Sequence, residues 1–520
     1  MLELLHKILP RAAREHALFT WLRDAGRMRR FVAGMPGAAP AARPPRRVAV
    51  VLAPWSGSEV PWFSMAFGLL LAARGSTVTF ILDDMPFGSG GKRWKLEIAC
   101  IRSVLKAVRR RHRVVELSAF APAGAVSEAS RAAIARLAHL NMVWTHRGES
   151  KIPAGAAEAA QALLETSDGR IAAAVKAEPF DVLFVPGGVW GTSGLWIRHA
   201  RAAGARVASY DSGGYHVLLL AVNGIACQLQ DIPRSFALLK EHAATGPERS
   251  LVTDFALGEI GKRRAGTDKF ASQVQSARPK DPRFTGAVLI ALNSSWDSAA
   301  LGLHAVFPST QEWIVETTRY VLANTQAPVV VRQHPVERLP IGRSNDDYGA
   351  LLRQHFGDDP RVHFIAAADP VNSYDLLEQA CAVVTYTSTI GVEAAVQGKM
   401  VVTESSSYYA DLGFVLKATT AEQYFQHLSD AVSGRRTVTA EMQADAVYCY
   451  YITQCCNWVK TPFTVPDFPQ WSLLPFSDLA QDRSVRSVLE AVETDTPISF
   501  LNHLHRLAEV RSAAQPVLQP

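Results

Sequence analysis

Short apolar runs rich in β-branched residues alternate with longer segments of helical spacing along much of this chain. Such runs, bounded by turn residues, predict buried parallel strands, and the segments between them predict crossover helices. The first series places strands at residues 47–53, 77–82, 113–117, 181–185 and 205–210. This alternation of strand and helix predicts a doubly wound α/β domain.

A second series of the same kind follows a mixed, polar stretch. It predicts strands at residues 286–292, 328–332, 361–365, 382–385 and 400–403. We therefore expect an α/β protein with two Rossmann-like domains and a helical C-terminal segment, since 520 residues are too many for one ordinary core. The predicted parts are a basic N-terminal arm and linker, an N-terminal domain, a connecting segment, a C-terminal domain and a helical segment, over residues 1–45, 46–223, 224–284, 285–418 and 419–520.

Composition narrows the class of protein. The chain is 48% apolar and 20% charged, which is typical of a folded protein in water. No apolar run approaches the roughly 18–20 residues that a membrane-spanning helix needs, and the first residues lack the apolar core of a signal peptide. The six cysteines show no CxxC spacing and suit a reducing cytoplasm, so we expect neither a disulfide framework nor a zinc site.

Positive charge is concentrated at the N-terminus, although the net charge of the chain is only +6. Ten lysines and arginines precede Val48 against three acids, and leucines and other apolar residues interleave with them. A basic amphipathic segment of this kind can lie on an anionic membrane surface. A solvated arm, or a helix packed on the body of the protein, explains the same pattern. No nucleic-acid-binding motif accompanies the charge, so we expect no nucleic-acid partner.

Residues 381–403 carry the most informative pattern. A β-branched strand is followed by a polar turn and then by small and apolar residues at helical spacing, which Gly398 ends. Ser388 and Thr389 therefore lie where a helix begins, and the unpaired N–H groups and dipole of a helix N-terminus favour a phosphate. Glu393, about one turn further on, can accept hydrogen bonds from a ribose. An ordinary helix capped by a serine or threonine explains the same spacing.

Two further polar segments are predicted at the carboxyl ends of strands in the same domain, where open α/β sheets bind ligands. One is the loop at residues 293–298, and the other begins at Arg332 and includes His334. Together with the turn just described, they place cationic and neutral donors around one phosphate position. We therefore predict a nucleotide-phosphate site in the C-terminal domain.

All three polar segments resemble motifs of a known family. VVVRQHP at residues 329–335 and TYTSTIGVEAAVQGKMVV at residues 385–402 look like the basic-x-His-Pro and Ser-Thr-x-Gly-x-Glu motifs of bacterial capsule polysaccharide biosynthesis glycosyltransferases, which include CMP-Kdo-using Kdo transferases. ALNSSWDSAALG at residues 291–302 is similar to the family's loop that ends in Asp-Ser. SYDSGGYHVLLLAVNGIACQLQD at residues 209–231 resembles, more loosely, a segment with an acidic-x-Gly motif. The resemblance spans residues 209–409.

The resemblance implies a GT-B-like enzyme, in which two Rossmann-like domains face each other across a cleft and a nucleotide sugar, here a CMP-sugar, is the donor. It implies that His334 and the Ser388-Thr389 turn hold the donor phosphate and that Glu393 contacts the ribose or base. The other donor-side residues that the motifs imply are Arg332, Gly391, Asp297 and Ser298.

The same resemblance implies that Asp211 is the acid/base or stabilising carboxylate of the N-terminal domain, with His334 as the second catalytic residue. The family's acidic-x-Gly motif usually has a second acid where this chain has Ser212. A cap at a strand end explains Asp211 as well, and that interpretation is favoured for Asp83 and Asp84.

Two loops rich in glycine, serine and tryptophan are predicted to face the cleft on the acceptor side, because Trp rings stack on sugar faces. Packing at an interface explains these tryptophans equally well. The candidate acceptor-side residues are Trp55, Ser56, Gly57, Trp190 and Gly191.

We expect a cytoplasmic glycosyltransferase that moves a sugar, such as Kdo or a related acidic sugar, from a nucleotide sugar to a surface-polysaccharide or lipid-linked acceptor. It can rest on the inner membrane through its basic N-terminus. No cofactor or metal is expected, since no Asp-x-Asp triad or histidine cluster has ligand spacing. Two alternatives stay open: a transferase of CDP-glycerol-type polyol phosphates, and a non-catalytic partner that binds glycan or nucleotide sugar in capsule export.

Overall fold

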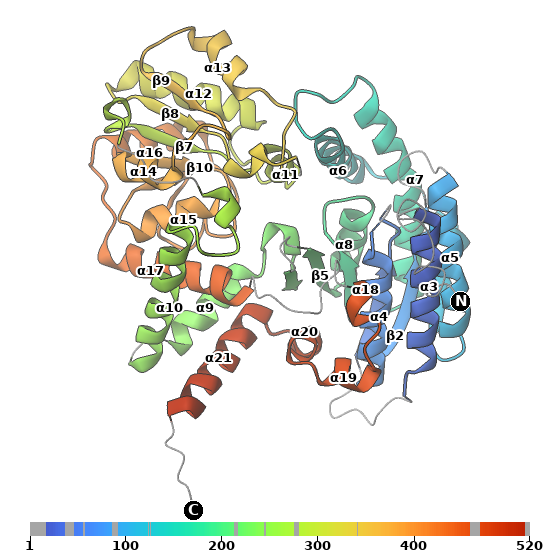
Figure 1. The fold of residues 1–520 in the computed structure, drawn as a ribbon. Helices are drawn as coiled ribbons and strands as arrows, with labels where there is room; N and C mark the ends of the chain where they lie inside the picture. The colour runs from blue at the N-terminus through green and yellow to red at the C-terminus, as the bar shows by residue number, and fades with distance from the viewer. Residues whose placement is uncertain are drawn as a thin grey trace, which may run out of the picture. The chain divides into compact units, whose positions relative to one another are not determined.

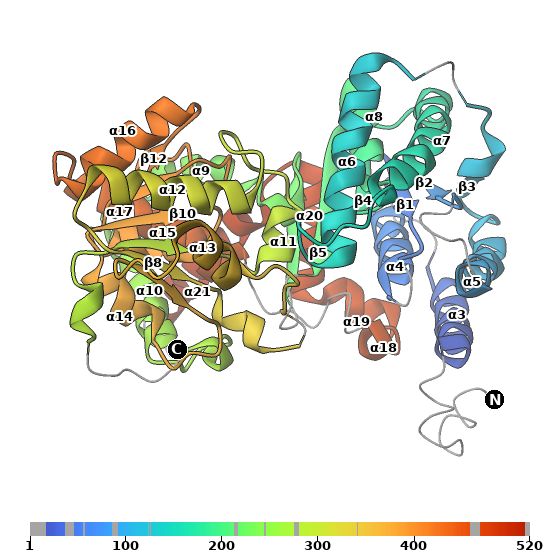
Figure 2. The same ribbon diagram turned by 90° about the horizontal axis from the view of Figure 1, so that it is seen from above.

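The computed structural model describes residues 17–36, 46–55, 58–85, 92–122, 124, 126–212, 217–243, 246–274, 280–340, 342–457 and 468–514. Within these ranges the chain forms two compact units, each built on one six-stranded sheet (Figures 1 and 2). The first unit takes in the described parts of residues 1–139, 157–231 and 458–502, and the second unit those of 140–156, 232–457 and 503–520.

The elements alternate between helix and strand for most of the chain. Up to residue 231 they are α3 (Ala17–Ala33), β1 (Arg47–Leu52), α4 (Val60–Ala73), β2 (Thr77–Leu82), α5 (Lys92–Val108), β3 (Arg113–Glu116), η1 (Leu117–Ala119), α6 (Glu128–His146), α7 (Ala156–Ala177), β4 (Val182–Pro186), α8 (Ser193–Ala202), β5 (Arg206–Ser212), β6 (Leu218–Val222) and η2 (Ala226–Gln228).

From residue 232 onward the elements are α9 (Ile232–His242), α10 (Pro247–Arg264), η3 (Ala271–Gln273), η4 (Pro282–Phe284), β7 (Val288–Ala291), α11 (Ser295–Ala299), α12 (Thr310–Asn324), β8 (Val329–Arg332), η5 (Pro335–Arg338), α13 (Tyr348–Phe356), β9 (Val362–Ile365), α14 (Ser373–Gln379), β10 (Ala382–Thr385), α15 (Thr389–Val396), β11 (Val401–Thr403), β12 (Leu416–Lys417), α16 (Ala421–Val432), α17 (Ala440–Tyr450), the π-helix η6 (Tyr451–Asn457), α18 (Phe468–Trp471), α19 (Phe476–Gln481), α20 (Arg483–Thr494) and α21 (Ile498–Ala514).

The two sheets share one topology. The first has the order β3-β2-β1-β4-β5-β6, and the second has the order β12-β11-β10-β7-β8-β9, which is the same sequence of strands seen from the other end. All neighbouring strands are parallel except β5 and β6, which pair in the antiparallel direction. The strand order reverses between β1 and β4 in the first unit and between β7 and β10 in the second. Each unit therefore has the switch point of a Rossmann-like domain.

The central strands are buried because helices cover parallel sheets on both faces, which explains their continuous β-branched sequences. The predicted fold class, two Rossmann-like α/β domains with a helical C-terminal segment, is confirmed. β6 was not predicted. It extends the edge of the first sheet and lengthens β5 beyond the strand expected at residues 205–210. No helix in the described ranges is long and apolar enough to span a membrane.

The structure differs from the predicted boundary of the N-terminal arm. Helix α3 is part of the core of the first unit, where Trp21, Met28 and Phe31 are buried. The rings of Trp21 and Trp62 lie 5.3 Å apart, which joins α3 to α4. Residues 17–33 of the predicted arm are thus a helix packed on the body of the protein. The rest of the predicted arm, residues 1–16 and 37–45, lies outside the described residues.

The predicted C-terminal segment, residues 419–520, is divided between the two units. Trp471 of α18 lies in the core of the first unit, and so do Val488 and Leu489, because one face of α20 is apolar. Arg506 instead belongs to the second unit, where it donates to the carbonyl of Cys455 at 2.7 Å.

Candidate functional site

The loops after β7 and β10 meet at the switch point of the second sheet. β7 and β10 are paired neighbours, with Ala291 beside Thr385 at their carboxyl ends. The backbone N–H of Thr387 donates to Oδ1 of Asn293 at 3.2 Å, so the two loops are tied directly. Two of the three polar segments predicted from the sequence are therefore brought together.

The third segment, the His-Pro turn after β8, is tied to the loop after β7 through Glu337. This buried carboxylate accepts from the backbone N–H and from the hydroxyl of Ser295, both at 3.0 Å. Its other oxygen accepts from Nε2 of Gln333 at 2.7 Å. Glu337 lies in η5, two residues after the proline, and sequence analysis missed it because only its position in the fold shows what it joins.

The turn between β10 and α15 is held by Tyr409. The Tyr409 hydroxyl donates to the carbonyl of Ser388 at 3.1 Å and lies 3.0 Å from Oγ1 of Thr385. Gly391 is needed beside these atoms, because a Cβ there would lie 2.9 Å from Oγ1 of Thr385 and 3.0 Å from the Tyr409 hydroxyl. Ser388 is the N-cap residue of α15, but its side chain makes no cap hydrogen bond. The simple cap interpretation of Ser388 thus does not describe this turn.

Arg332 lies at the end of β8 and is 2% exposed. Its guanidinium donates to the carbonyls of Ala366 and Val371 and to the hydroxyl of Ser373, with distances of 3.1 Å to Val371 and 3.3 Å to Ser373. Burial lowers the pKa of Arg332 to about 10. These contacts hold the loop between β9 and α14, and direct contact with a phosphate stays a prediction.

His334 is half-buried and caps the His-Pro turn, since its Nδ1 accepts from the backbone N–H of Val336 at 3.2 Å. Burial, together with the positive charges of Arg332 and Arg263, lowers the pKa of His334 to about 4. The imidazole is therefore neutral at pH 7. Because Nδ1 accepts, the proton lies on Nε2, which is a hydrogen-bond donor for a ligand.

Glu393 and Arg263 form a second part of the same region. Glu393 lies on α15 and is 3% exposed. Burial raises the pKa of its carboxyl, against the positive charge of Arg263 and a hydrogen bond from Tyr374. Arg263 lies in the last turn of α10. Its Nε is 3.0 Å from the carboxylate of Asp268, and its guanidinium is 3.8 Å from the ring centre of Phe270. The basic run at the end of α10 was the available signal, but a single sequence does not show that α10 packs near α15.

The remaining donor-side candidates lie on α11. The hydroxyl of Ser298 donates to the carbonyl of Ser294 at 3.2 Å. Ser298 is buried, whereas Asp297 is exposed. Ser298 thus stabilises the short helix itself. Asp297 is free of that role, and its contact with a donor stays a prediction.

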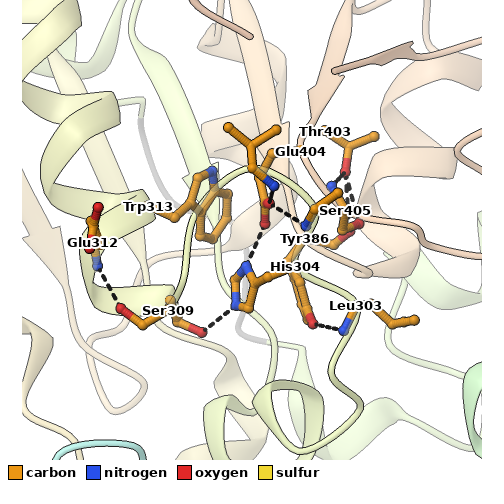
Figure 3. Close-up of polar contacts among 12 residues, drawn as sticks. Leu303, His304, Ser309, Glu312, Trp313, Tyr386, Thr403, Glu404 and Ser405 are labelled. Atoms are coloured by element: carbon orange, nitrogen blue, oxygen red, sulfur yellow. Dashed lines mark hydrogen bonds and ion pairs between the residues drawn. The ribbon is translucent and has the colours of Figure 1, made fainter. Parts of the chain in front are cut away.

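Figure 3 shows a further polar cluster, which sequence analysis did not single out. Glu404 directly follows β11 and is fully buried. Its Oε1 lies 2.6 Å from Nδ1 of His304, and its Oε2 accepts from the N–H of Ala305 at 3.1 Å. Nε2 of His304 lies 3.2 Å from Oγ1 of Thr310, and the ring is 4.2 Å from that of Tyr386. Both ring nitrogens of His304 have protein partners. The His304–Glu404 pair therefore holds the loop at residues 303–306 beside the turn after β10.

In the first unit, the two predicted acceptor loops also meet at a switch point. Trp55 packs over Gly187, where a Cβ would lie 2.8 Å from the indole ring. Trp190 is half-buried, and Gly191 has a positive φ of 60° in the turn before α8. Ser56 and Gly57 lie outside the described residues.

Asp211 lies inside β5, paired with Leu219 of β6, and its Oδ1 accepts from the N–H of Ser212 at 2.7 Å. The preceding residue, Tyr210, accepts from the N–H of Gly187 at 2.7 Å, which places Asp211 next to the acceptor-loop candidates. Its catalytic role stays a prediction.

Asp83 and Asp84 have structural partners in the first unit. Oδ2 of Asp83 accepts from Oγ1 of Thr192 at 2.5 Å and from Nε1 of Trp196 at 2.8 Å. Asp84 accepts from the N–H of Ser118 at 2.8 Å. Both side chains are buried, so their carboxylates join loops of the sheet. Across the described residues, no group of three or more His, Cys, Asp or Glu side chains is arranged to hold a metal ion.

Comparison with known proteins gives a family match within the second unit. Residues 234–452 match the family model described as capsule polysaccharide biosynthesis protein. A comparison with curated proteins finds no match.

Solved structures similar to this chain include the KpsC β-Kdo 2,4 transferase of Thermosulfurimonas dismutans, with 17% identity, a TM-score of 0.35, and coverage of 52% of this chain and 79% of that one. MurG of Acinetobacter baumannii has 12% identity and a TM-score of 0.24, with coverage of 78% of this chain and 95% of that one. At these values the matches carry no functional argument. The resemblance to capsule polysaccharide biosynthesis proteins is nevertheless confirmed over residues 234–452, which match that family's model, and the roles of the individual motif residues stay a prediction.

Proposed function

We propose that this protein is a glycosyltransferase that moves a sugar from a nucleotide-sugar donor to a surface-polysaccharide or lipid-linked acceptor. The observation that carries the proposal is the meeting of three polar loops at the switch point of the second sheet, inside the family-matched segment. Loops at the carboxyl ends of parallel strands beside a switch point are where open α/β sheets bind nucleotides.

In this proposal the donor phosphate binds at the N-terminus of α15. The dipole and unpaired N–H groups of a helix N-terminus favour an anion, and the Ser388 hydroxyl makes no cap bond that a ligand would have to replace. The Nε2–H group of neutral His334 adds a donor, and Arg263 adds positive charge nearby. Donors fixed in this way stabilise the phosphate as it leaves with the nucleotide.

Glu393 is the proposed partner of the ribose or base, with Tyr374 and Arg263 orienting its carboxylate. A CMP-linked acidic sugar such as Kdo is the first donor to test, because the motifs resemble those of CMP-Kdo-using transferases. Asp211 is the proposed carboxylate that takes the proton of the acceptor hydroxyl. Trp55 and Trp190 are proposed to contact the acceptor, a glycan or glycolipid. The proposed reaction requires no cofactor.

The experiment is a thermal-shift screen of the full chain with CMP-, UDP- and GDP-sugars and CDP-glycerol, followed by turnover of whatever binds. The true donor should stabilise the folded state by mass action. The Ser388→Ala variant should bind that donor about 10-fold more weakly, since one hydrogen bond to a charged group is lost.

Ser309→Ala is the matched control, because Ser309 is an N-cap serine of the same unit whose Oγ does accept from the N–H of Glu312, at 3.2 Å. It should lower stability by about 1 kcal/mol and leave donor affinity unchanged. Stabilisation and turnover with CDP-glycerol alone would replace the proposal with polyol-phosphate transfer. Binding without turnover for every donor would indicate a non-catalytic partner.

A further inference from the structure

Helix α5 carries a stripe of positive charge on its exposed side. Residues 92–113 contain nine lysines and arginines and a single acid, Glu97. Lys95, Arg102 and Lys106 are exposed, and their spacing of seven and four residues places them on one face of the helix. Arg110, in the turn that follows α5, is exposed as well. The opposite face is apolar and lies in the core of the first unit.

Part of this charge is neutralised within the protein. Arg102 pairs with Asp84 and Glu116, and Arg109 pairs with Glu116, all at 2.8 Å. By contrast, no carboxylate of the described residues forms an ion pair with Lys95, Lys106 or Arg110. These three side chains therefore present net positive charge to the solvent.

Helix α3 extends the same surface. The guanidinium of Arg29 donates to the hydroxyl of Ser103 at 3.1 Å, and that of Arg111 donates to the carbonyl of Met35 at 3.0 Å. These two contacts show that the helices run in the same direction, and Figures 1 and 2 both show them side by side. Arg29 and Arg30 are exposed, and Leu22, two turns earlier on that side of α3, is 38% exposed.

We propose that this basic face, formed by Arg29, Arg30, Lys95, Lys106 and Arg110, docks on a bilayer that contains anionic lipid. The apolar stripe of α3 is buried in the protein core, so it is not the part that meets the membrane. Attraction comes instead from charge on two packed helices and on the turn after α5, and each basic group near an anionic surface adds to it.

A lipid surface fits better than a nucleic acid because apolar groups accompany the charge. Leu22 lies on the exposed side of α3, two turns before Arg29. A mixture of leucine-type and basic side chains matches the boundary between headgroups and acyl chains. Stacking of bases would instead call for exposed aromatic rings.

The test uses the full chain and vesicles of phosphatidylcholine with and without phosphatidylglycerol, followed by co-sedimentation at low and high salt. The triple variant Lys95→Gln, Lys106→Gln, Arg110→Gln should bind anionic vesicles about 100-fold more weakly than the parent chain. The control Lys151→Gln, Arg249→Gln, Arg353→Gln removes the same charge from exposed positions of the second unit and should bind as the parent does.

Binding of the parent chain should also fall with added salt and be weak on vesicles without phosphatidylglycerol. Equal losses in both triple variants, or equal binding to neutral vesicles, would overturn the proposal. Loss of binding to a single-stranded oligonucleotide with unchanged binding to anionic vesicles would assign the face to nucleic acid instead. Donor-induced thermal shifts, measured on the same variants, report on the second unit's site and keep this test separate from the proposed transferase activity.

Discussion

Thr387 and Asn293 are joined by a hydrogen bond of 3.2 Å, from a backbone N–H after β10 to a side-chain oxygen after β7. The two strands are neighbours in the sheet but about ninety residues apart in the sequence. One amide side chain therefore links the two loops beyond the ends of the paired strands, at the candidate phosphate site.

Removing that amide tests its role. Asn293→Ala should lower the free energy of unfolding by about 1 kcal/mol, the usual contribution of one hydrogen bond, as measured by urea denaturation. It should also weaken donor binding, because the turn that carries Ser388 loses a support. Asn293→Asp keeps the acceptor oxygen and should recover most of the stability. Donor affinity equal to that of the parent chain in Asn293→Ala would mean that the turn is held by Tyr409 alone.

Gly391 tests the packing behind the turn. A methyl group at this position collides with Thr385 and Tyr409, so Gly391→Ala should destabilise the protein by about 1–3 kcal/mol. Gly258→Ala is the matched control, since a Cβ there meets nothing within 4 Å and the helix should gain slightly from alanine. Chemical denaturation of both variants makes the comparison. Similar melting of both would show that Tyr409 can move aside at little cost.

His334 predicts a pH dependence of stability. Its pKa is about 4 in the folded protein, against about 6.5 for an ordinary histidine, so the unfolded chain binds more protons between these values. The shifted pKa of His334 therefore leaves the free energy of unfolding unchanged above about pH 6.5. As the pH falls towards 4, it lowers that free energy by up to about 3 kcal/mol. Unfolding free energies across this range should fall less steeply for His334→Asn than for the parent. His503, with a pKa also near 4, acts in the same direction in both proteins.

A bound phosphate should move the same pKa upward, because a nearby negative charge favours the imidazolium ion. Nitrogen-detected NMR of the histidine rings, with and without the nucleotide, measures this directly. An unchanged His334 titration in the saturated complex would remove His334 from the phosphate site.

Substitution of Asp211 tests whether its carboxylate is catalytic or structural. Asp211→Asn should retain donor binding and lower turnover by roughly 10²–10⁴-fold if Asp211 is the general base. Asp83→Asn is the structural comparison, because Asp83 is buried and accepts from Thr192 and Trp196. It should lower stability. Full activity in Asp211→Asn would mean that the base lies elsewhere, and the contacts of Asp83 and Asp84 make them poor substitutes.

Two adjacent residues of α3 should differ strongly in how much their substitution destabilises the protein. Trp21→Ala removes a ring packed on Trp62 in the core and should cost about 3–5 kcal/mol. Leu22→Ala changes an exposed side chain and should stay within about 0.5 kcal/mol of the parent. Equal, small effects in thermal and urea melts would restore the view of this segment as a loosely attached arm.

Most of the fold could be predicted because buried parallel strands leave a direct mark on the sequence. The runs that form β1, β4, β8 and β10 are continuous and β-branched, and each is bounded by turn residues. Helix α3 was harder, since its many arginines suit a membrane surface, a solvated arm and a packed helix alike. Its contacts with α4 and α5 show that it is a packed helix rather than a solvated arm.

The candidate site was predictable only in part, for a related reason. Ser388 and His334 lie at strand ends, which the sequence marks, and the structure brings their loops together. Glu337 and Arg263 act on groups that are far away in the sequence, so no local spacing identifies them. Arg332 shows the opposite case: its motif position suggested a phosphate, and its guanidinium is largely used by neighbouring carbonyls.

The division of each unit among three stretches of chain has a consequence for synthesis on the ribosome. All six strands of the first sheet have been made by residue 222, yet α20, whose Val485, Val488 and Val492 complete that core, comes more than two hundred residues later. Until then the nascent first unit exposes the apolar surface that α20 will cover. Because domains fold as units, the second sheet, made later, can form before the first core is closed, and a chain that stops at residue 457 would leave that core open.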